Sequence, residues 1–345
     1  MRRPRTMTPT VIDGCPDDAS APARRPPRIP LIDWLRGFAL VAMAVYHFTW
    51  DLGYFGYIDP STATTGGWRF FARMIASSFL FLAGFSLVLA HARGLRPKPF
   101  MIRLARILAA ALVITAGTWF AFPDTFIFFG ILHAIAAASV IGLIFLRLPV
   151  AAILVAAVAV TAAPLYLRAP VFDHPALWWV GLSLHIPRSN DYVPLLPWLA
   201  PFLAGMAACR LLLAGKLAEQ LAAIGTGVHS RWITLLEKAG RHSLAIYLVH
   251  QPVLIALLYG ISLVAPAPAV DLATAYRSSC IDACEVEREE TFCRSFCPCT
   301  LERLIEQNLF SDLMRNAIDV AQDDRIAEIS SQCTMATESG SAAKE

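Results

Sequence analysis

An apolar stretch near the start of the chain carries four ionisable side chains: Asp33, Arg36, His47 and Asp51. An ionisable group inside a membrane span costs about 2.5–3.5 kcal/mol or more, so each is a candidate functional residue. Arg36 and His47 are eleven residues apart, which places them on one helix face, about 16 Å apart along the axis. The pattern predicts one polar stripe, with Arg36 near the cytosol and His47 in the outer half of the span.

A second cationic pair, Arg103 and Arg106, opens a later apolar stretch. The two residues are at i, i+3 spacing and therefore share a helix face. Together with Arg36 they are predicted to bind an anionic cytosolic ligand, because the planar guanidinium group matches the geometry of a phosphate. The alternative is that they only anchor the span at the positively charged side of the membrane.

Histidines in later apolar stretches are further candidates. His133 is predicted to lie at a depth close to that of His47, which indicates a shared cavity; a hydrogen-bonded histidine that packs the bundle is the alternative. His250 is interpreted as structural as readily as functional. Four residues of one outer loop are predicted to be solvated, with contact to an acceptor as the alternative: Asp173, His174, His185 and Asp191.

The chain that positions these residues is dominated by apolar blocks. Of its 345 residues 57% are hydrophobic and 16% are charged, against roughly 25% charged in a soluble domain. Blocks of about 20 apolar residues cross the hydrocarbon layer as helices, because lipid offers the backbone no hydrogen-bond partners. The sequence predicts an all-α polytopic bundle with about seven spans. They lie near residues 31–52, 68–90, 101–122, 127–146, 149–167, 193–214 and 244–265.

Basic residues concentrate in alternate connections between these blocks. The N-terminal arm has six and residues 91–106 have five, whereas residues 53–67 and 122–126 have none. This alternation predicts a cytosolic N-terminus and, with an odd number of spans, a C-terminal segment outside the cell. The same alternation accounts for the excess of basic residues in this part of the chain, so nucleic-acid binding is not needed to explain it. A short apolar stretch at 176–186 is predicted to lie at the interface or to re-enter, and residues 216–239 to form a cytosolic amphipathic helix.

Three regions follow from this topology. Residues 1–28 are predicted to be a disordered cytosolic arm, residues 29–266 the membrane domain, and residues 267–345 a small helical tail outside the membrane. From residue 271 onward the tail has fifteen acidic and seven basic residues. It also holds six of the eight cysteines: Cys280, Cys284, Cys293, Cys297, Cys299 and Cys333.

An even number of cysteines in a small extracytoplasmic segment predicts three disulfides, with a cytosolic zinc site as the alternative. The first two pairs have i, i+4 spacing, which indicates two helices that face each other as a stapled hairpin. Pro298 is predicted to break the second helix, and Cys299 is within reach of Cys333 across a long helix near 300–328. The connectivity stays open.

Several motifs resemble those of membrane acyltransferases. The first span, IDWLRGFALVAMAVYH, has the arginine, ten residues and histidine of the acyltransferase type 3 family, and FLFLAGFSL, MIRLARIL and GRHSLAIYLVH resemble its later helices. The overall run, with FFGILHAIA and DYVPLLPWLAPFLAG, is more similar to bacterial proteins that share the catalytic domain of heparan-alpha-glucosaminide N-acetyltransferase. The resemblance covers roughly residues 30–265.

The resemblance implies acyl transfer from cytosolic acetyl-CoA to a hydroxyl or amine of an extracytoplasmic glycan or lipid-linked sugar, in a bacterial inner membrane. Arg36, Arg103 and Arg106 would hold the phosphates of CoA, and no metal is implied. His47 would act as general base or acyl carrier, and Asp51 would orient it. The N-acetyltransferase relatives carry asparagine at the position of His47 and a catalytic histidine in the following loop. The loop 53–67 contains no histidine here, so the type 3 arrangement is the guide.

Two other classes of function fit parts of the pattern. A transporter or flippase would use the same intramembrane charges as a proton or substrate relay. An inactive scaffold would present the cysteine-rich tail. The tail matches neither acyltransferase family and is expected to dock a second copy of the chain, another protein or the acceptor.

Overall fold

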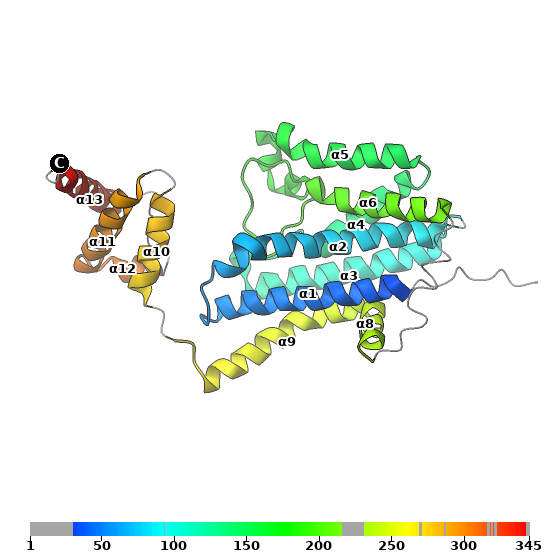
Figure 1. Ribbon diagram of the computed structural model, residues 1–345, viewed down its shortest axis with the longest axis horizontal. Coiled ribbons are helices and arrows are strands. Elements are labelled where there is room, and N and C mark those ends of the chain that lie inside the picture. Colours follow the sequence, from blue (N-terminus) through cyan, green and yellow to red (C-terminus); the bar gives the residue numbers. More distant parts are fainter. Residues whose placement is uncertain are drawn as a thin grey trace, which may run out of the picture. The chain divides into compact units, whose positions relative to one another are not determined.

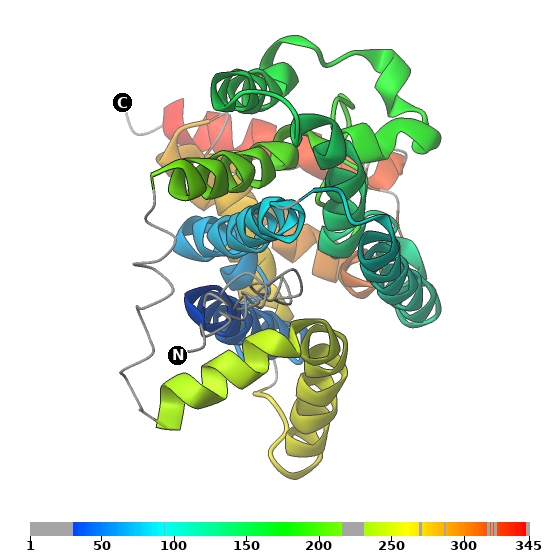
Figure 2. The ribbon, with the colours of Figure 1, turned by 90° about the vertical axis from the view of Figure 1, so that its right-hand side faces the viewer.

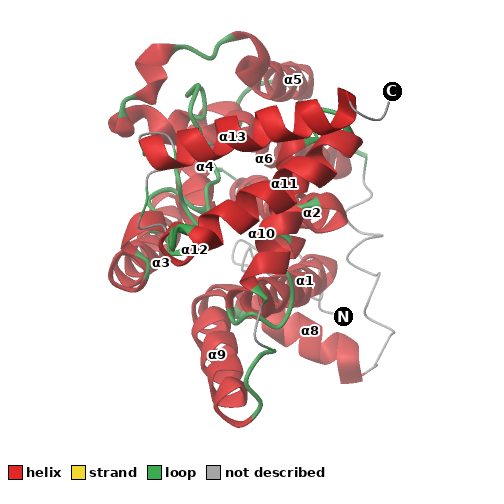
Figure 3. Ribbon diagram, turned by 90° about the vertical axis from the view of Figure 1, so that its left-hand side faces the viewer, coloured by secondary structure: helices red, strands yellow, loops and turns green. Residues whose placement is uncertain are grey.

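The computed structural model describes residues 30–342 apart from 93, 216–230, 269–270, 286–287, 316–317, 319 and 321–322. Regular structure in these residues is entirely helical (Figures 1 and 3). The chain divides into a first unit, residues 1–47 and 67–253, and a second unit, residues 48–66 and 254–345. The predicted arm at 1–28 lies outside the described residues.

Five helices are long and apolar enough to cross a membrane. They are α1 (Pro30–Tyr54), α2 (Gly66–His91), α3 (Pro97–Ala121), α6 (Leu195–Ala214) and α9 (Ser243–Val264). Two shorter apolar helices, α4 (Ile131–Phe145) and α5 (Val150–Tyr166), occupy the other two predicted ranges. The expectation of a polytopic helical bundle is confirmed, and Figure 2 shows several of these helices nearly end-on. Large exposed side chains such as Phe120, which is 85% exposed, suit a lipid-facing surface.

The fourth apolar helix begins four residues later than the sequence predicts. The backbone of 125–129 is hydrogen-bonded to the segment before α6: Asn190 N donates to Thr125 O at 2.8 Å, and Val193 N donates to Phe129 O at 3.0 Å. Because these groups find partners outside a helix, residues 126–130 stay non-helical and α4 starts at Ile131.

The core of the first unit lies between α2, α3, α4, α5 and α6, around buried residues such as Leu80, Ile153 and Phe202. Helix α5 packs along α6, and α4 contacts both α3 and α6. Two glycines allow α2 and α6 to approach closely. A Cβ atom at Gly84 would strike the carbonyl group of Phe202, and one at Gly205 would strike that of Phe81. Small residues at such crossings are typical of helix packing in membranes.

A similar contact joins α1 to α8 (Arg231–Arg241). A Cβ atom at Gly37 would strike the carbonyl of Leu236, and one at Gly240 would strike that of Asp33. The structure thus contains the C-terminal part of the predicted amphipathic helix, whereas residues 216–230 lie outside the described residues. The short stretch 176–186 forms a 3₁₀ helix, Pro175–Val180, followed by loop, and not a span.

The second unit contains α10 (Leu272–Cys284), α11 (Glu290–Glu306), α12 (Phe310–Met314) and α13 (Asp324–Ala342). Helix α11 packs against the other three (Figure 3). Three disulfides join Cys280 to Cys297, Cys284 to Cys293 and Cys299 to Cys333, so the predicted disulfides and stapled hairpin are confirmed. The two disulfides of α10 and α11 join opposite ends of the i, i+4 pairs, as antiparallel helices require.

Two details of the predicted tail are wrong. Pro298 does not break the second helix, since α11 continues through it to Glu306. No long helix runs over 300–328 either. A turn with Asn308 at a φ of 57° follows α11, and the chain then forms the short α12. Leu304, Leu309 and Ile329 are buried together, which explains why the chain folds back there.

Candidate active site

Three arginines predicted to act together line one cavity of the first unit. Arg36 comes from α1, and Arg103 and Arg106 come from α3. The cavity has a volume of about 690 Å³. Its other walls are apolar residues of α2, α3 and α4 together with Ser243, Leu244 and Tyr247 of α9. Residues from five helices therefore surround a space with three positive charges and no carboxylate in its lining.

The guanidinium group of Arg36 is oriented by its neighbours. It donates to Asp33 Oδ1 at 3.4 Å and to Ser86 Oγ of α2. Asp33 also pairs with Arg241, at 3.7 Å from its Nε. Arg241 reaches Asp33 where α1 and α8 approach closely, since the neighbouring Gly240 lies against the carbonyl group of Asp33.

The charges of the other two arginines are not neutralised within the described part of the chain. Neither Arg103 nor Arg106 forms an ion pair there, and the guanidinium groups of Arg36 and Arg103 repel each other. Such a site gains electrostatic energy from an anion. The arrangement can therefore hold a phosphate group.

His47 is half-buried on α1, and its ring lies against that of His250 on α9. The ring centroids are 5.0 Å apart at an interplanar angle of 62°. The ring of Tyr247, which lines the arginine cavity, is 5.6 Å from that of His250. A continuous line of side chains thus leads from the cavity to His47. Sequence reasoning left the role of His250 open, because its contact with His47 depends on how α9 packs.

The tautomer of His250 follows from one hydrogen bond. Its Nδ1 lies 2.7 Å from the carbonyl oxygen of Tyr247, which can only accept, so Nδ1 carries the hydrogen in the neutral ring. Its Nε2 is buried without a hydrogen-bond partner in the described structure. A buried imidazole nitrogen with a free lone pair, held by a backbone carbonyl, has the arrangement of a general base or nucleophile.

The structure does not bring His133 to this pair. Its Nδ1 accepts from Gly130 N at 3.3 Å, and its Nε2 lies 3.3 Å from Thr115 Oγ1, which donates to Ile127 O. Both ring nitrogens therefore have partners that fix the turn before α4. These contacts favour the packing alternative for His133. Asp51 is completely buried on α1, in the part of that helix that belongs to the second unit.

Asp191 was predicted to be a solvated loop residue, but the structure gives its carboxylate a specific hydrogen-bond partner. Its Oδ2 accepts from Ile131 N at 2.9 Å and so caps α4, whose own N-cap residue, Gly130, has no side chain. Burial raises the pKa of Asp191 to about 6. The carboxylate also acts electrostatically on Tyr46 and Tyr247. Because Asp191 is hydrogen-bonded to Ile131, which lines the arginine cavity, its carboxylate lies next to that cavity.

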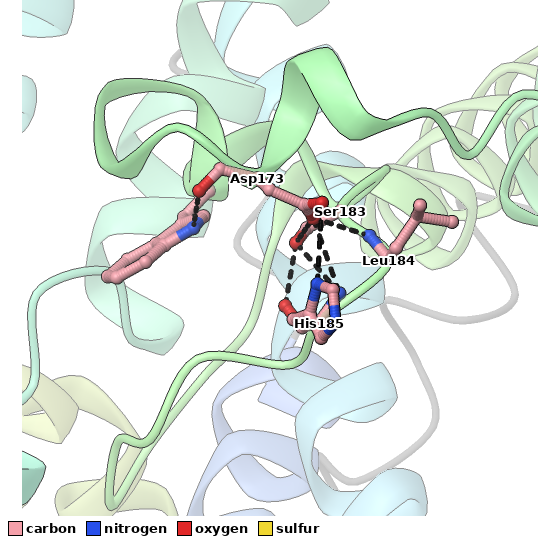
Figure 4. A network of polar contacts seen from close by, with 5 residues as sticks. Asp173, Ser183, Leu184 and His185 are labelled. Carbon is pink, nitrogen blue, oxygen red and sulfur yellow. Dashed lines mark hydrogen bonds and ion pairs between the residues drawn. The ribbon is translucent and has the colours of Figure 1, made fainter.

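The remaining polar residues of this loop form a separate network (Figure 4). Asp173 accepts from Ser183 Oγ at 2.6 Å and from Leu184 N at 2.8 Å, and it pairs with His185 at 3.3 Å. The hydrogen bond from Ser183 is the main reason that the pKa of Asp173 falls to about 2. His185 points into solvent with 87% of its side chain exposed. The network closes the loop and is not part of the cavity.

Apolar helices around a cationic cavity beside a half-buried histidine pair define an integral-membrane protein that can hold an anionic substrate next to a base. The chain belongs to the family of the catalytic domain of heparan-alpha-glucosaminide N-acetyltransferase, whose family model matches residues 28–252, well over half of its length. It is therefore a membrane acyltransferase by class. Comparison with curated proteins and with solved structures gives no match.

Proposed function

We propose that the protein transfers an acyl group, in the first instance acetyl, from cytosolic acyl-CoA to a hydroxyl or amine of an extracytoplasmic glycan or lipid-linked sugar. The observation that carries this proposal is the cavity that Arg36, Arg103 and Arg106 share. The nucleotide part of CoA carries several phosphates, and charge-assisted hydrogen bonds from arginine are the usual means of binding them.

The orientation in the membrane follows from the charges at the helix ends. The start of α3, the α4–α5 turn and the end of α6 carry Arg96, Lys98, Arg147 and Arg210, whereas Asp124, Asp173 and Asp191 lie in the connections at the other helix ends. The connection that holds Asp173 and Asp191 also holds Arg168 and Arg188, so these helix ends have little net charge. We place the basic end in the cytosol and the end of low net charge outside. Acyl-CoA then enters from the arginine side, and the acceptor approaches from the side of Asp191.

The acyl group is proposed to reach the histidine pair by the extension of the pantetheine arm. Arg36 and His47 are separated by about 16 Å along α1. Tyr247 forms the wall of the cavity on the side of the histidines, and His250 lies one helical turn farther along α9. A phosphate held by the arginines therefore leaves the thioester near the two imidazoles.

The chemistry requires one base and one path for the proton. For direct transfer, His47 removes the proton of the acceptor hydroxyl or amine as its oxygen or nitrogen attacks the thioester carbon, and the C–S bond breaks to release CoA as the thiolate. The imidazolium then returns the proton to the thiolate. If His47 is instead acylated first, its nitrogen forms the bond to the carbonyl carbon, CoA leaves, and the acceptor takes the acyl group in a second step.

His250 is proposed to assist His47 through its unprotonated Nε2. When Nε2 of His250 accepts a proton from His47, the ring of His47 stays neutral and its free nitrogen can act as base or nucleophile. Asp51 remains a further prediction as an orienting carboxylate for the same helix. Neither role needs a metal ion.

The test is acyl transfer by the intact purified protein with radiolabelled acetyl-CoA, with the release of free CoA as the readout. His47→Gln should retain acetyl-CoA binding and lose about 10²–10⁴ in rate. His250→Gln should do the same, and the double variant should be little worse than either single variant if the pair acts as one unit. Transfer at the parental rate by His47→Gln would refute the assignment.

Binding is tested separately with the double variant Arg103→Gln/Arg106→Gln. Loss of charge-assisted phosphate contacts should weaken acetyl-CoA binding by roughly tenfold or more. The matched control is Arg96→Gln/Lys98→Gln, which removes two exposed cations from the same end of α3 outside the cavity lining. Equal affinities for acetyl-CoA in the two double variants would show that Arg103 and Arg106 only anchor the helix at the cytosolic side of the membrane. Binding without turnover in the parental protein would favour the transporter alternative.

A further inference from the structure

A second cavity of similar size lies on the other side of α2. Its volume is about 680 Å³. Val88, His91 and Ala92 of α2 line it, whereas Phe79, Leu82 and Ala83 line the arginine cavity described above. At about 100° per residue these two sets project from opposite faces of the helix. The two cavities are therefore separated by α2.

The second cavity is basic. Arg210 donates to the carbonyl oxygens of Leu146 and Leu148 in the α4–α5 turn, so its guanidinium group is held in one place with donors left over. Arg147 of the same turn lines the cavity, is exposed and forms no ion pair with any described residue. No acidic residue contributes to the lining.

The rest of the lining is apolar, and the cavity lies at the ends of helices. Helix α2 ends at His91, α4 ends at Phe145, α5 begins at Val150 and α6 ends at Ala214. These ends come together at one end of the first unit (Figure 1). Leu95 is 56% exposed and Leu213 is 36% exposed, so the apolar wall continues onto an exposed apolar surface.

We propose that this cavity binds the phosphate headgroup of an anionic phospholipid from the cytosolic leaflet. The two guanidinium groups match a phosphate at the level of the headgroups, and the apolar wall accommodates the start of an acyl chain. A free phosphate would leave most of a cavity of this size unfilled. The inference depends on the membrane orientation proposed above and not on the acyltransferase reaction.

The test is native mass spectrometry of the intact protein titrated with short-chain phosphatidylglycerol, phosphatidylcholine or inorganic phosphate. Arg147→Gln should weaken phosphatidylglycerol binding by roughly tenfold. The parent should bind phosphatidylcholine more weakly than phosphatidylglycerol, because the basic cavity repels the choline cation. Arg147 forms no side-chain hydrogen bond or ion pair with another described residue, so this variant remains informative if Arg210→Gln fails to fold. The matched control is Lys238→Gln, an exposed cation of α8 outside both cavity linings, which should bind phosphatidylglycerol as the parent does.

Two further outcomes separate this site from the proposed active site. Arg103→Gln/Arg106→Gln should still bind phosphatidylglycerol, and Arg147→Gln should still bind acetyl-CoA. Loss of acetyl-CoA binding in Arg147→Gln would overturn the proposal, because the cavity would then belong to the CoA site. Equal phosphatidylglycerol binding by Arg147→Gln and Lys238→Gln, or equally tight binding of inorganic phosphate, would overturn it as well.

Discussion

Asp191 has two roles in the structure that one pair of substitutions can separate. Its carboxylate accepts a hydrogen bond from Ile131 N and caps α4, and it is also a half-buried titratable group whose pKa is raised. Asp191→Asn keeps an oxygen that can accept the same hydrogen bond, since asparagine is as good an N-cap as aspartate. Asp191→Ala removes both the cap and the charge. Comparison of the two variants therefore isolates the effect of the charge.

The magnitude follows from the shift of the pKa. Burial raises the pKa of Asp191 from 3.8 to about 6. Between these values the folded protein binds more protons than the unfolded chain, so the free energy of unfolding falls as the pH rises from about 4 to about 6. A shift of about 2 units corresponds to about 3 kcal/mol, at about 1.4 kcal/mol per unit. The parental protein should lose this stability across that window, and Asp191→Asn should not.

The assay is thermal unfolding of the purified protein at a series of pH values between 4 and 8. The difference in stability between Asp191→Asn and the parent should increase from pH 4 to pH 6 and then level off. Asp191→Ala should show the same pH dependence, displaced downward by about 1 kcal/mol for the lost cap. Asp124→Asn, an exposed carboxyl of the α3–α4 connection, is the control. If the Asp191→Asn difference does not change with pH, then the pKa of Asp191 is not raised in the folded protein.

Three other predictions concern the fold and the topology. Gly84→Leu should destabilise the first unit by about 1–3 kcal/mol or more, because the new side chain would strike the backbone of Phe202. The control in the same unfolding assay is Gly117→Leu, since a Cβ atom at Gly117 meets nothing within 4 Å. Asp173→Asn should increase cleavage of the 168–192 loop in limited proteolysis at neutral pH. In the parent the pKa of Asp173 is lowered to about 2, so its carboxylate stays charged at neutral pH. Cleavage of the loop in the parent should therefore increase only as the pH falls from about 4 toward 2. In intact cells an impermeant thiol reagent should label the tail only after reduction with an impermeant reductant; labelling only after lysis would place the tail in the cytosol.

The fold was largely predictable because its signals are local. A block of about 20 apolar residues forms a helix in lipid whatever its neighbours do. The six tail cysteines likewise indicated disulfides through their number and spacing. The errors arose where distant segments compete for the backbone. The pairing of 125–129 with 190–193 shortened α4, and burial of Leu309 and Ile329 turned the chain where a long helix was expected.

The candidate site was predictable only in part, for the same reason. Helical spacing placed Arg36 and His47 on one face of one helix, and it placed Arg103 with Arg106. It could not show that Asp191 caps α4 from 60 residues away, because that contact depends on the loop before α6. No local signal pointed to this contact, because the helix was predicted to begin at residue 127, which placed Gly130 inside the helix and not at its start.

The position of α9 decides how the proposed reaction can work. Its Tyr247 packs beside the cluster of Leu40, Met43 and Ile75, while one turn later its His250 contacts His47. On α1 alone the nearest imidazole, that of His47, is about 16 Å along the helix axis from Arg36. With α9 in place, the wall of the cavity at Tyr247 is about one helical turn, roughly 5 Å, from the nearest imidazole. In the proposed reaction the acyl group therefore needs to leave the cavity by only one turn, and we expect the histidine pair, and not His47 alone, to act on it as base or acyl carrier.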